Sequence, residues 1–103
     1  MNKDYFFDKI MDLVTETMGI SKDDIISTNK KMSVIDARSM VVYFANKVGL
    51  PQDYIRKRLQ RNSHNSIPNL LETYYKRSKS SYFHYLSMTI ARSVENIMSA
   101  NCQ

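Results

Sequence analysis

Glycine, proline and cysteine are all scarce in this chain of 103 residues. Glycine and proline number two each, which leaves few positions for tight turns and argues against an all-β fold. The single cysteine, Cys102, cannot form a disulfide within the chain, and near the terminus we expect it to be an inert, exposed thiol. These shortages favour an all-α fold without internal cross-links.

Long apolar runs are also absent. No segment approaches the roughly 20 apolar residues that a membrane span requires, so we expect no membrane partner. Residues 1–12 carry acidic side chains where a secretory signal would be apolar, which predicts a cytoplasmic protein. A length of 103 residues allows one modest core and predicts a single domain over residues 1–103.

Basic side chains are abundant but unevenly distributed. Residues 1–26 hold three basic and six acidic side chains, whereas residues 27–79 hold eleven basic and three acidic ones. The net charge of +5 therefore comes from the middle of the chain, where it would attract nucleic-acid phosphates. A basic surface that serves solubility alone is the alternative.

The N-terminal segment predicts one long helix and one short one. Residues 4–18 have apolar side chains at helical spacing, and Gly19 is placed to end that helix in a left-handed conformation. Ser21 is suited to cap a short helical turn, with Asp24 three residues later. Acidic side chains recur every fourth residue along the long helix, and we expect a solvated row directed away from phosphates. They are Asp4, Asp8, Asp12 and Glu16.

A basic segment follows at residues 27–33. It has no apolar periodicity and contains Lys30 and Lys31, so we expect a loop. Such a loop is suited to cross a phosphate backbone or to enter a minor groove, and an ordinary solvated loop is the alternative. Arg38 lies close to this loop in sequence and is a candidate phosphate contact.

The next helix is predicted over residues 34–48. Its broad apolar stripe is typical of a central core helix. We expect Ser33 to start the helix, Asp36 to favour its positive N-terminal end, and Gly49 to end it.

Residues 51–77 carry the pattern around which we interpret the chain. Pro51 suits the first position of a short helix over residues 51–60, a turn follows at 61–63, and Ser63 is a suitable N-cap for a longer helix. This is the layout of a helix-turn-helix, in which the second helix enters the DNA major groove. Polar side chains in its first turns are candidates for reading base edges. They are Ser63, His64, Asn65, Ser66 and Asn69.

Basic side chains surround this pattern on both sides. By releasing counterions from phosphates, they would make the affinity for DNA fall steeply with salt concentration. The candidates for phosphate or minor-groove contacts are Lys30, Lys31, Arg38, Arg56, Lys57, Arg61, Lys76 and Arg77.

A final helix is predicted from about residue 82 to residue 98, with apolar side chains three or four residues apart. Residues 78–81 should break or kink the chain, so that this helix packs back over the core. One continuous helix from Ser66 onward would instead expose its apolar face and require a partner chain. The periodicity as a whole predicts a compact all-α domain of five to six helices.

Residues 27–67 resemble the C-terminal DNA-binding domain of the bacterial replication initiator DnaA. The matching positions follow one another without an insertion and are Ser27, Lys30, Ser33, Val34, Arg38, Leu50, Pro51, His64, Ser66 and Ile67. The resemblance implies a Trp-repressor-like helical domain that binds double-stranded DNA, in replication initiation or transcription regulation. Its helix-turn-helix and its basic loop would both contact the DNA.

The chain departs from that family at positions that contact bases. Lys30 stands where the family places a minor-groove arginine, and Ser63 and Asn65 replace its aspartate and its first threonine. The family's binding-site sequence is therefore not carried over. The chain contains no Gly-rich, Lys-containing phosphate loop, so we expect no ATPase motor, in either an excised module or a free-standing relative.

Two other classes of function stay open. A DnaA-like helical module would also serve as a protein–protein adaptor, with a partner protein or a second copy as its target, because seven tyrosines suit an interface. An enzyme is the third class. His64 and His84 have no metal-site or nucleophile spacing, and Cys102 has no histidine nearby in sequence. We therefore expect no catalytic residue, no metal ion and no cofactor.

Overall fold

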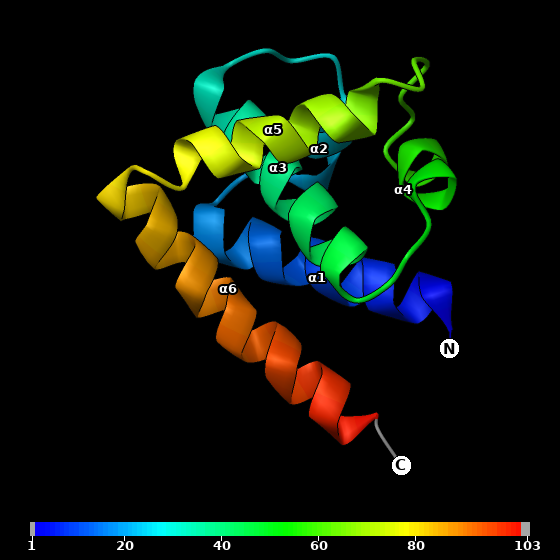
Figure 1. Cartoon of the computed structure of the whole chain (residues 1–103), viewed down its shortest axis with the longest axis vertical. Coiled ribbons are helices and arrows are strands. Elements are labelled where there is room, and N and C mark those ends of the chain that lie inside the picture. The colour runs from blue at the N-terminus through cyan, green and yellow to red at the C-terminus, as the bar shows by residue number, and fades with distance from the viewer. Residues whose placement is uncertain (1, 102–103) are drawn as a thin grey trace.

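The structure, a computed structural model, describes residues 2–101 of the chain. Over these residues the chain forms six α-helices and no β-strand (Figure 1). The helices are α1 (Lys3–Met18), α2 (Lys22–Ile26), α3 (Met32–Lys47), α4 (Gln52–Arg58), α5 (Ser66–Arg77) and α6 (Ser81–Ala100). The predicted all-α class is confirmed.

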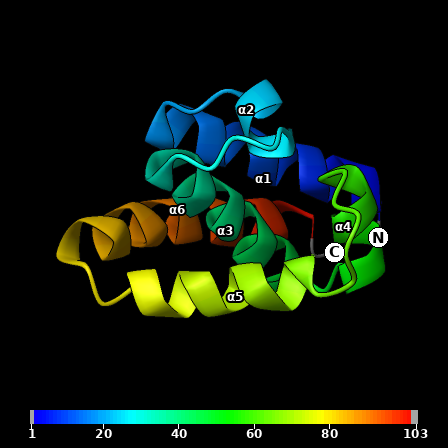
Figure 2. The ribbon, with the colours of Figure 1, turned by 90° about the horizontal axis from the view of Figure 1, so that it is seen from above.

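Helix α3 is the centre of the fold. It contacts all five other helices, and Figure 2 shows it between α1 on one side and α5 on the other. Its apolar stripe includes Met40 and Phe44, which pack with Phe7 of α1 and Ile90 of α6, each of them at most 2% exposed. Burying one such side chain contributes about 1.5–3 kcal/mol, so α3 positions the surrounding helices.

Several predicted helix ends agree with the structure. Gly19 ends α1 with a left-handed φ of 69°, and the Oγ of Ser21 accepts a hydrogen bond from the N–H of Asp24 at 3.1 Å. Gly49 follows α3 with φ at 96°. Pro51 lies one residue before α4 rather than at its first position.

Two predicted N-caps are wrong. Helix α3 begins at Met32, so Ser33 already lies inside it. Helix α5 begins at Ser66, and the Oγ of Ser63 accepts a hydrogen bond from the N–H of Asn65 at 3.2 Å, inside the preceding turn.

Helix α6 packs back on the core, as predicted. The chain turns between α5 and α6, and the Oγ of Ser80 accepts from the N–H of Phe83 at 3.5 Å to start α6. A hydrogen bond joins the hydroxyls of Tyr74 in α5 and Ser87 in α6. Because α6 contacts α1 and α3, the alternative of one continuous helix is excluded.

The acidic row of α1 has a structural role that the sequence did not reveal. Arg58 of α4 donates to Asp8 at 2.6 Å and to Asp4 at 3.0 Å, and Lys22 pairs with Asp12 at 2.6 Å. These carboxylates remain largely solvent-accessible, as expected for surface ion pairs. They nevertheless tie α4 and the start of α2 to α1.

Candidate nucleic-acid interface

A turn formed by residues 59–65 joins α4 to α5. Its second residue, Gln60, has a left-handed conformation, φ 56°, which redirects the backbone at the end of α4. Ser63, His64 and Asn65 are exposed. They lie in the turn, ahead of α5, and not on its first turn as the sequence suggested, because α5 starts only at Ser66.

A polar stripe continues from this turn along α5. Ser66 is partly buried and Asn69 is exposed, while Ile67 and Tyr74 face the core. Thr73 extends the stripe by one turn, and its hydroxyl donates to the carbonyl of Asn69 at 3.1 Å. Sequence reasoning did not include Thr73, although its spacing of four residues from Asn69 was the available signal.

The predicted basic loop occupies residues 27–31 and has a defined conformation. The Oγ of Ser27 accepts from the N–H of Asn29 at 3.0 Å, and the Oδ1 of Asn29 accepts from the N–H of Lys31 at 2.9 Å. Lys30 and Lys31 are exposed, and neither forms an ion pair within residues 2–101. Their charges are therefore available to an anionic partner.

Arg38 is corrected from a phosphate contact to an anchor of this loop. It is only 5% exposed, and its guanidinium donates to the carbonyls of Ile25 at 2.7 Å, Ser27 at 2.9 Å and Asn29 at 3.2 Å. Burial lowers the pKa of Arg38, and the nearby positive charge of Arg61 lowers it further. The side chain is committed to backbone carbonyls, so it does not reach out to a ligand.

Arg61 has a similar role in the turn between α4 and α5. Its guanidinium donates to the carbonyls of Ile26 at 2.8 Å, Ser27 at 2.6 Å and Leu59 at 3.0 Å. Burial lowers the pKa of Arg61 as well. Arg61 thus joins the turn to the end of α2, and its predicted phosphate contact must compete with these bonds.

Two of the basic residues of α4, Arg56 and Lys57, share one carboxylate. Arg56 donates to Asp53 at 2.7 Å, and Lys57 lies 3.3 Å from the other oxygen of Asp53. Hydrogen bonds from Arg56 and Lys57 hold the pKa of the Asp53 carboxyl below its usual value. Lys57 is well exposed, so a phosphate in place of Asp53 is sterically accessible to it.

The basic residues at the end of α5 are also paired. Lys76 lies 2.8 Å from Glu72 on the exposed surface. Arg77 donates two hydrogen bonds of 2.9 Å to the buried carboxylate of Asp36, which raises the pKa of Arg77. Asp36 therefore binds α5 to α3 and does not serve the N-terminal end of α3 as predicted. Arg77 is therefore committed to Asp36, whereas Lys76 remains exposed in a surface pair of the same kind as Lys57 with Asp53.

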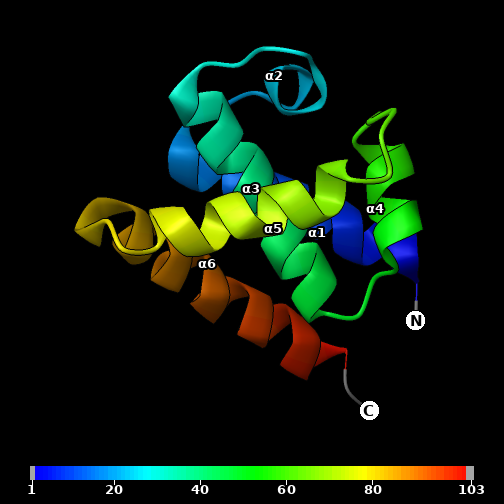
Figure 3. The same cartoon turned by 45° about the horizontal axis from the view of Figure 1, so that its top comes forward.

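The loop 27–31 and the turn 59–65 lie along the same edge of the molecule. Figures 1 and 3 place both at the upper edge, and both face the viewer in Figure 2. The last turn of α5, with Lys76 and Arg77, lies at the far end of that helix. We use the name loop–turn surface for the exposed side chains of Lys30, Lys31, His64, Asn65 and Asn69.

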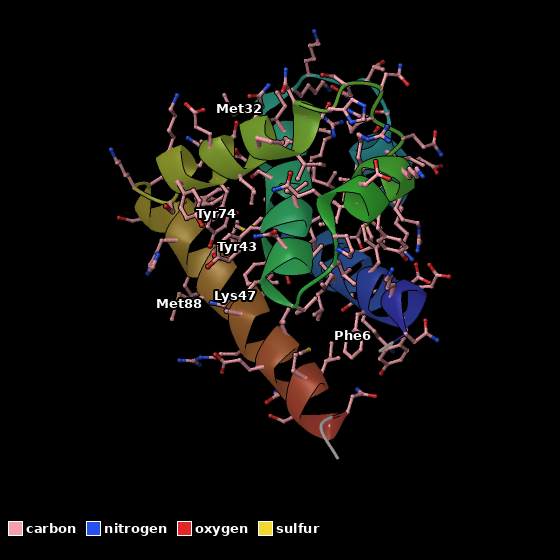
Figure 4. All side chains as sticks on the ribbon, turned by 45° about the vertical axis from the view of Figure 1, so that its right-hand side comes forward. Phe6, Met32, Tyr43, Lys47, Tyr74 and Met88 are labelled. Carbon is pink, nitrogen blue, oxygen red and sulfur yellow. The ribbon has the colours of Figure 1, made fainter. Side chains whose placement is uncertain are left out.

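Large apolar and aromatic side chains are exposed in two further places. Met32, at the start of α3, is 58% exposed and lies at the upper edge in Figure 4, whereas Met88 of α6 lies well below it. Tyr82 and Tyr85 of α6 are 73% and 67% exposed. Tyr74 of α5 is instead buried, and its ring is stacked on that of Tyr43 with 3.8 Å between ring centroids.

Comparison of the chain with protein families, with characterised proteins and with solved structures gives no match. Among residues 2–101, no cluster of three or more His, Cys, Asp or Glu side chains is arranged to hold a metal ion, and Cys102 lies outside this range. Within the same range, none of the helices combines the length and the apolar character needed to cross a membrane.

Proposed function

We propose that this protein binds double-stranded DNA with a preference for certain sequences. The observation that carries the proposal is the loop–turn surface. The loop 27–31, with the exposed Lys30 and Lys31, lies along the same edge as the turn 59–65, with the exposed His64 and Asn65 (Figure 1). Within residues 2–101 neither lysine forms an ion pair. Phosphate contacts by cations supply affinity, and polar side chains that reach base edges supply preference. The loop–turn surface combines both kinds of side chain.

The roles of its side chains follow from their chemistry. Lys30 and Lys31 neutralise phosphates and release counterions, which makes affinity depend on salt. Asn65 and Asn69 each present an amide that is able to pair with both N6 and N7 of adenine in the major groove. His64 offers an imidazole donor or acceptor beside them. No arginine of this surface is free for the common contact with guanine.

We further propose that α4, the turn 59–65 and α5 act as a helix-turn-helix of the type found in the DnaA C-terminal domain. In that arrangement α4 braces α5, while the N-terminal end of α5 approaches the major groove. Replication initiation and transcription regulation are both compatible with such a role.

Selection of bound sequences from a random duplex pool, at two salt concentrations, tests this proposal. We expect enrichment of a defined sequence, and an affinity that falls linearly with salt concentration on a log–log scale. Equal recovery of all sequences at both salt concentrations would refute sequence preference. A complex whose affinity is independent of salt would refute phosphate contacts by the loop–turn surface.

The substitution Asn65→Ala isolates base reading. If Asn65 pairs with an adenine, the variant loses ~1–3 kcal/mol of discrimination at one position of the selected site. Its stability should stay unchanged, because the Asn65 side chain does not cap α5. Asn96→Ala, an exposed asparagine of α6, is the matched control. If the Asn65→Ala variant selects the same DNA sequence as the unaltered protein, Asn65 does not read a base.

A protein–protein adaptor is the second candidate, favoured by the exposed tyrosines of α6. Tyrosine combines a large contact area with a polar tip, and Tyr82 and Tyr85 leave both accessible. If a second copy is the partner, sedimentation should show a dimer that Tyr82→Ser with Tyr85→Ser abolishes. A strict monomer at high concentration would exclude a second copy of the chain as the partner.

A further inference from the structure

One backbone oxygen connects the two segments of the loop–turn surface. The carbonyl of Ser27 accepts from Arg38 at 2.9 Å and from Arg61 at 2.6 Å. Arg38 comes from the core helix α3, whereas Arg61 belongs to the turn before α5. The loop 27–31 is therefore held from two sides, by the core and by the turn.

Both arginines use the carbonyls at the end of α2. Arg38 also binds the carbonyl of Ile25, and Arg61 also binds that of Ile26. Carbonyls at the C-terminal end of a helix carry partial negative charge, which favours cationic donors there. This attraction offsets the repulsion between two neighbouring guanidinium groups. Each planar fork reaches several acceptors at once, which a lysine ammonium on a flexible stem does not reproduce.

The hydrogen bonds of Arg61 explain why it differs from the other cations of this region. Lys30, Lys31 and Lys57 are exposed and point to solvent or to another exposed side chain. Arg61 is only partly exposed and donates only to backbone carbonyls within residues 2–101. A DNA phosphate could recruit it only by breaking bonds that hold the loop.

We propose that Arg61, together with Arg38, is a positioning residue that makes the loop 27–31 and the turn 59–65 behave as one rigid unit. This inference rests on the proposed function for its consequence: the loop and α5 then contact DNA at a fixed spacing. Such preorganisation favours the DNA sequence in which both contacts form together. A duplex that forms only one of the two contacts gains no affinity from the other.

The coupling itself is measurable without DNA, by amide hydrogen exchange in Arg61→Lys. The N–H groups of Asn29 and Lys31 are hydrogen-bonded within the loop. Loss of the Arg61 fork should speed their exchange by roughly ten-fold, because a hydrogen bond from a charged group is lost. Lys57→Gln, which removes a nearby exposed charge, should leave the exchange unchanged. Unchanged protection in Arg61→Lys would overturn the coupling.

DNA binding by Arg61→Lys and Arg61→Gln separates positioning from a phosphate contact. A positioning role predicts that both variants lose the preference for the selected duplex over a scrambled one, by roughly ten-fold, with the salt slope unchanged. A phosphate role predicts that Arg61→Lys keeps the preference, while Arg61→Gln lowers the slope by about one. That second pattern would overturn the inference.

Thermal unfolding of the Arg61 variants guards against a trivial loss of structure, and the preference is compared only for variants whose unfolding transition remains cooperative. If Arg61→Gln fails this criterion, Arg61→Lys alone still tests the inference. A positioning role is contradicted if Arg61→Lys keeps the preference for the selected duplex. If the unaltered protein prefers no duplex, the proposed function fails, and the hydrogen-exchange measurement still decides the coupling.

Discussion

The two ends of α5 differ in what their polar side chains do. At the N-terminal end, the neutral amides of Asn65 and Asn69 and the imidazole of His64 are exposed, and His64 forms no ion pair within residues 2–101. At the C-terminal end, Lys76 pairs with Glu72, and Arg77 holds the buried carboxylate of Asp36. One end of the helix is free for a ligand, and the other is used to hold the fold.

This difference shows that the number of basic residues overestimates the positive charge that is accessible to phosphates. The sequence places cations on both sides of the turn, but those on α5 are matched by carboxylates and those at Arg38 and Arg61 by carbonyls. Of the basic residues predicted to contact phosphates, Lys30 and Lys31 combine two properties. Their side chains are exposed, and they have no acidic partner in the described part of the chain. We expect them to dominate the electrostatics of binding.

The largest expected effect comes from the structural end of α5. Arg77→Ala leaves the buried Asp36 carboxylate without its bidentate partner and should lower the free energy of unfolding by about 2–3 kcal/mol. Lys76→Ala, which breaks only an exposed pair with Glu72, should leave the free energy of unfolding nearly unchanged. Denaturant titration of both variants measures the contrast, and equal losses would contradict it.

A comparable contrast is expected in DNA binding. Lys30→Ala combined with Lys31→Ala should weaken binding roughly ten-fold and reduce the salt slope by about two, with the stability unchanged. Lys76→Ala combined with Lys79→Ala removes the same charge at the end of α5 and just beyond it, where Lys79 is also exposed. This pair should weaken binding less, because it lies away from the loop–turn surface. Titrations at several salt concentrations compare the pairs. A larger loss from the second pair would place the phosphates at the C-terminal end.

Tyr74 tests the structural end in another way. Tyr74→Phe leaves the buried Ser87 hydroxyl unpaired and should cost about 1 kcal/mol. Burial raises the pKa of Tyr74, so its contribution to stability is complete below the unfolded value of about 10 and is lost as pH rises through the higher folded value. Thermal unfolding at alkaline pH should therefore show a smaller loss in Tyr74→Phe. Tyr75→Phe, at an exposed neighbour, controls for the loss of a hydroxyl.

The smallest effect is expected at Gln60, before the free end of α5. A non-glycine residue in the left-handed region is strained by about 1–2 kcal/mol, and glycine loses more conformational freedom on folding. Gln60→Gly should therefore stabilise the protein by only about 0.5 kcal/mol, measured by denaturant titration. A clear destabilisation would show that the Gln60 side chain has a role of its own.

Local patterns predicted the helices well. The apolar periodicity located α1 and α6 to within two residues at each end, and Gly19, Ser21 and Gly49 act where expected, because helix ends are governed by neighbours in sequence. The starts of α3 and α5 also lie within two residues of their predicted positions, but the predicted N-caps, Ser33 and Ser63, do not cap these helices.

The candidate site was predicted by its composition but not by its arrangement. The polar residues 63–66 and Lys30 and Lys31 could be selected from sequence, since their chemistry suits DNA. The sequence could not show which basic side chains lack a partner within the fold. Asp36 lies 41 positions from Arg77, and the carbonyl of Ser27 lies 34 positions from Arg61. Partners so far apart meet only when the core brings their helices together.

The sequence by itself determined that the chain forms helices, where most of them end, and that positive charge collects in the middle of the chain. These properties depend on side chains a few residues apart, within one helical turn. The tertiary structure decided which charged side chains are paired within the fold and which stay accessible to a ligand. Packing around α3 carries Asp36 to Arg77 and the end of α2 to Arg38 and Arg61, and leaves Lys30 and Lys31 facing solvent.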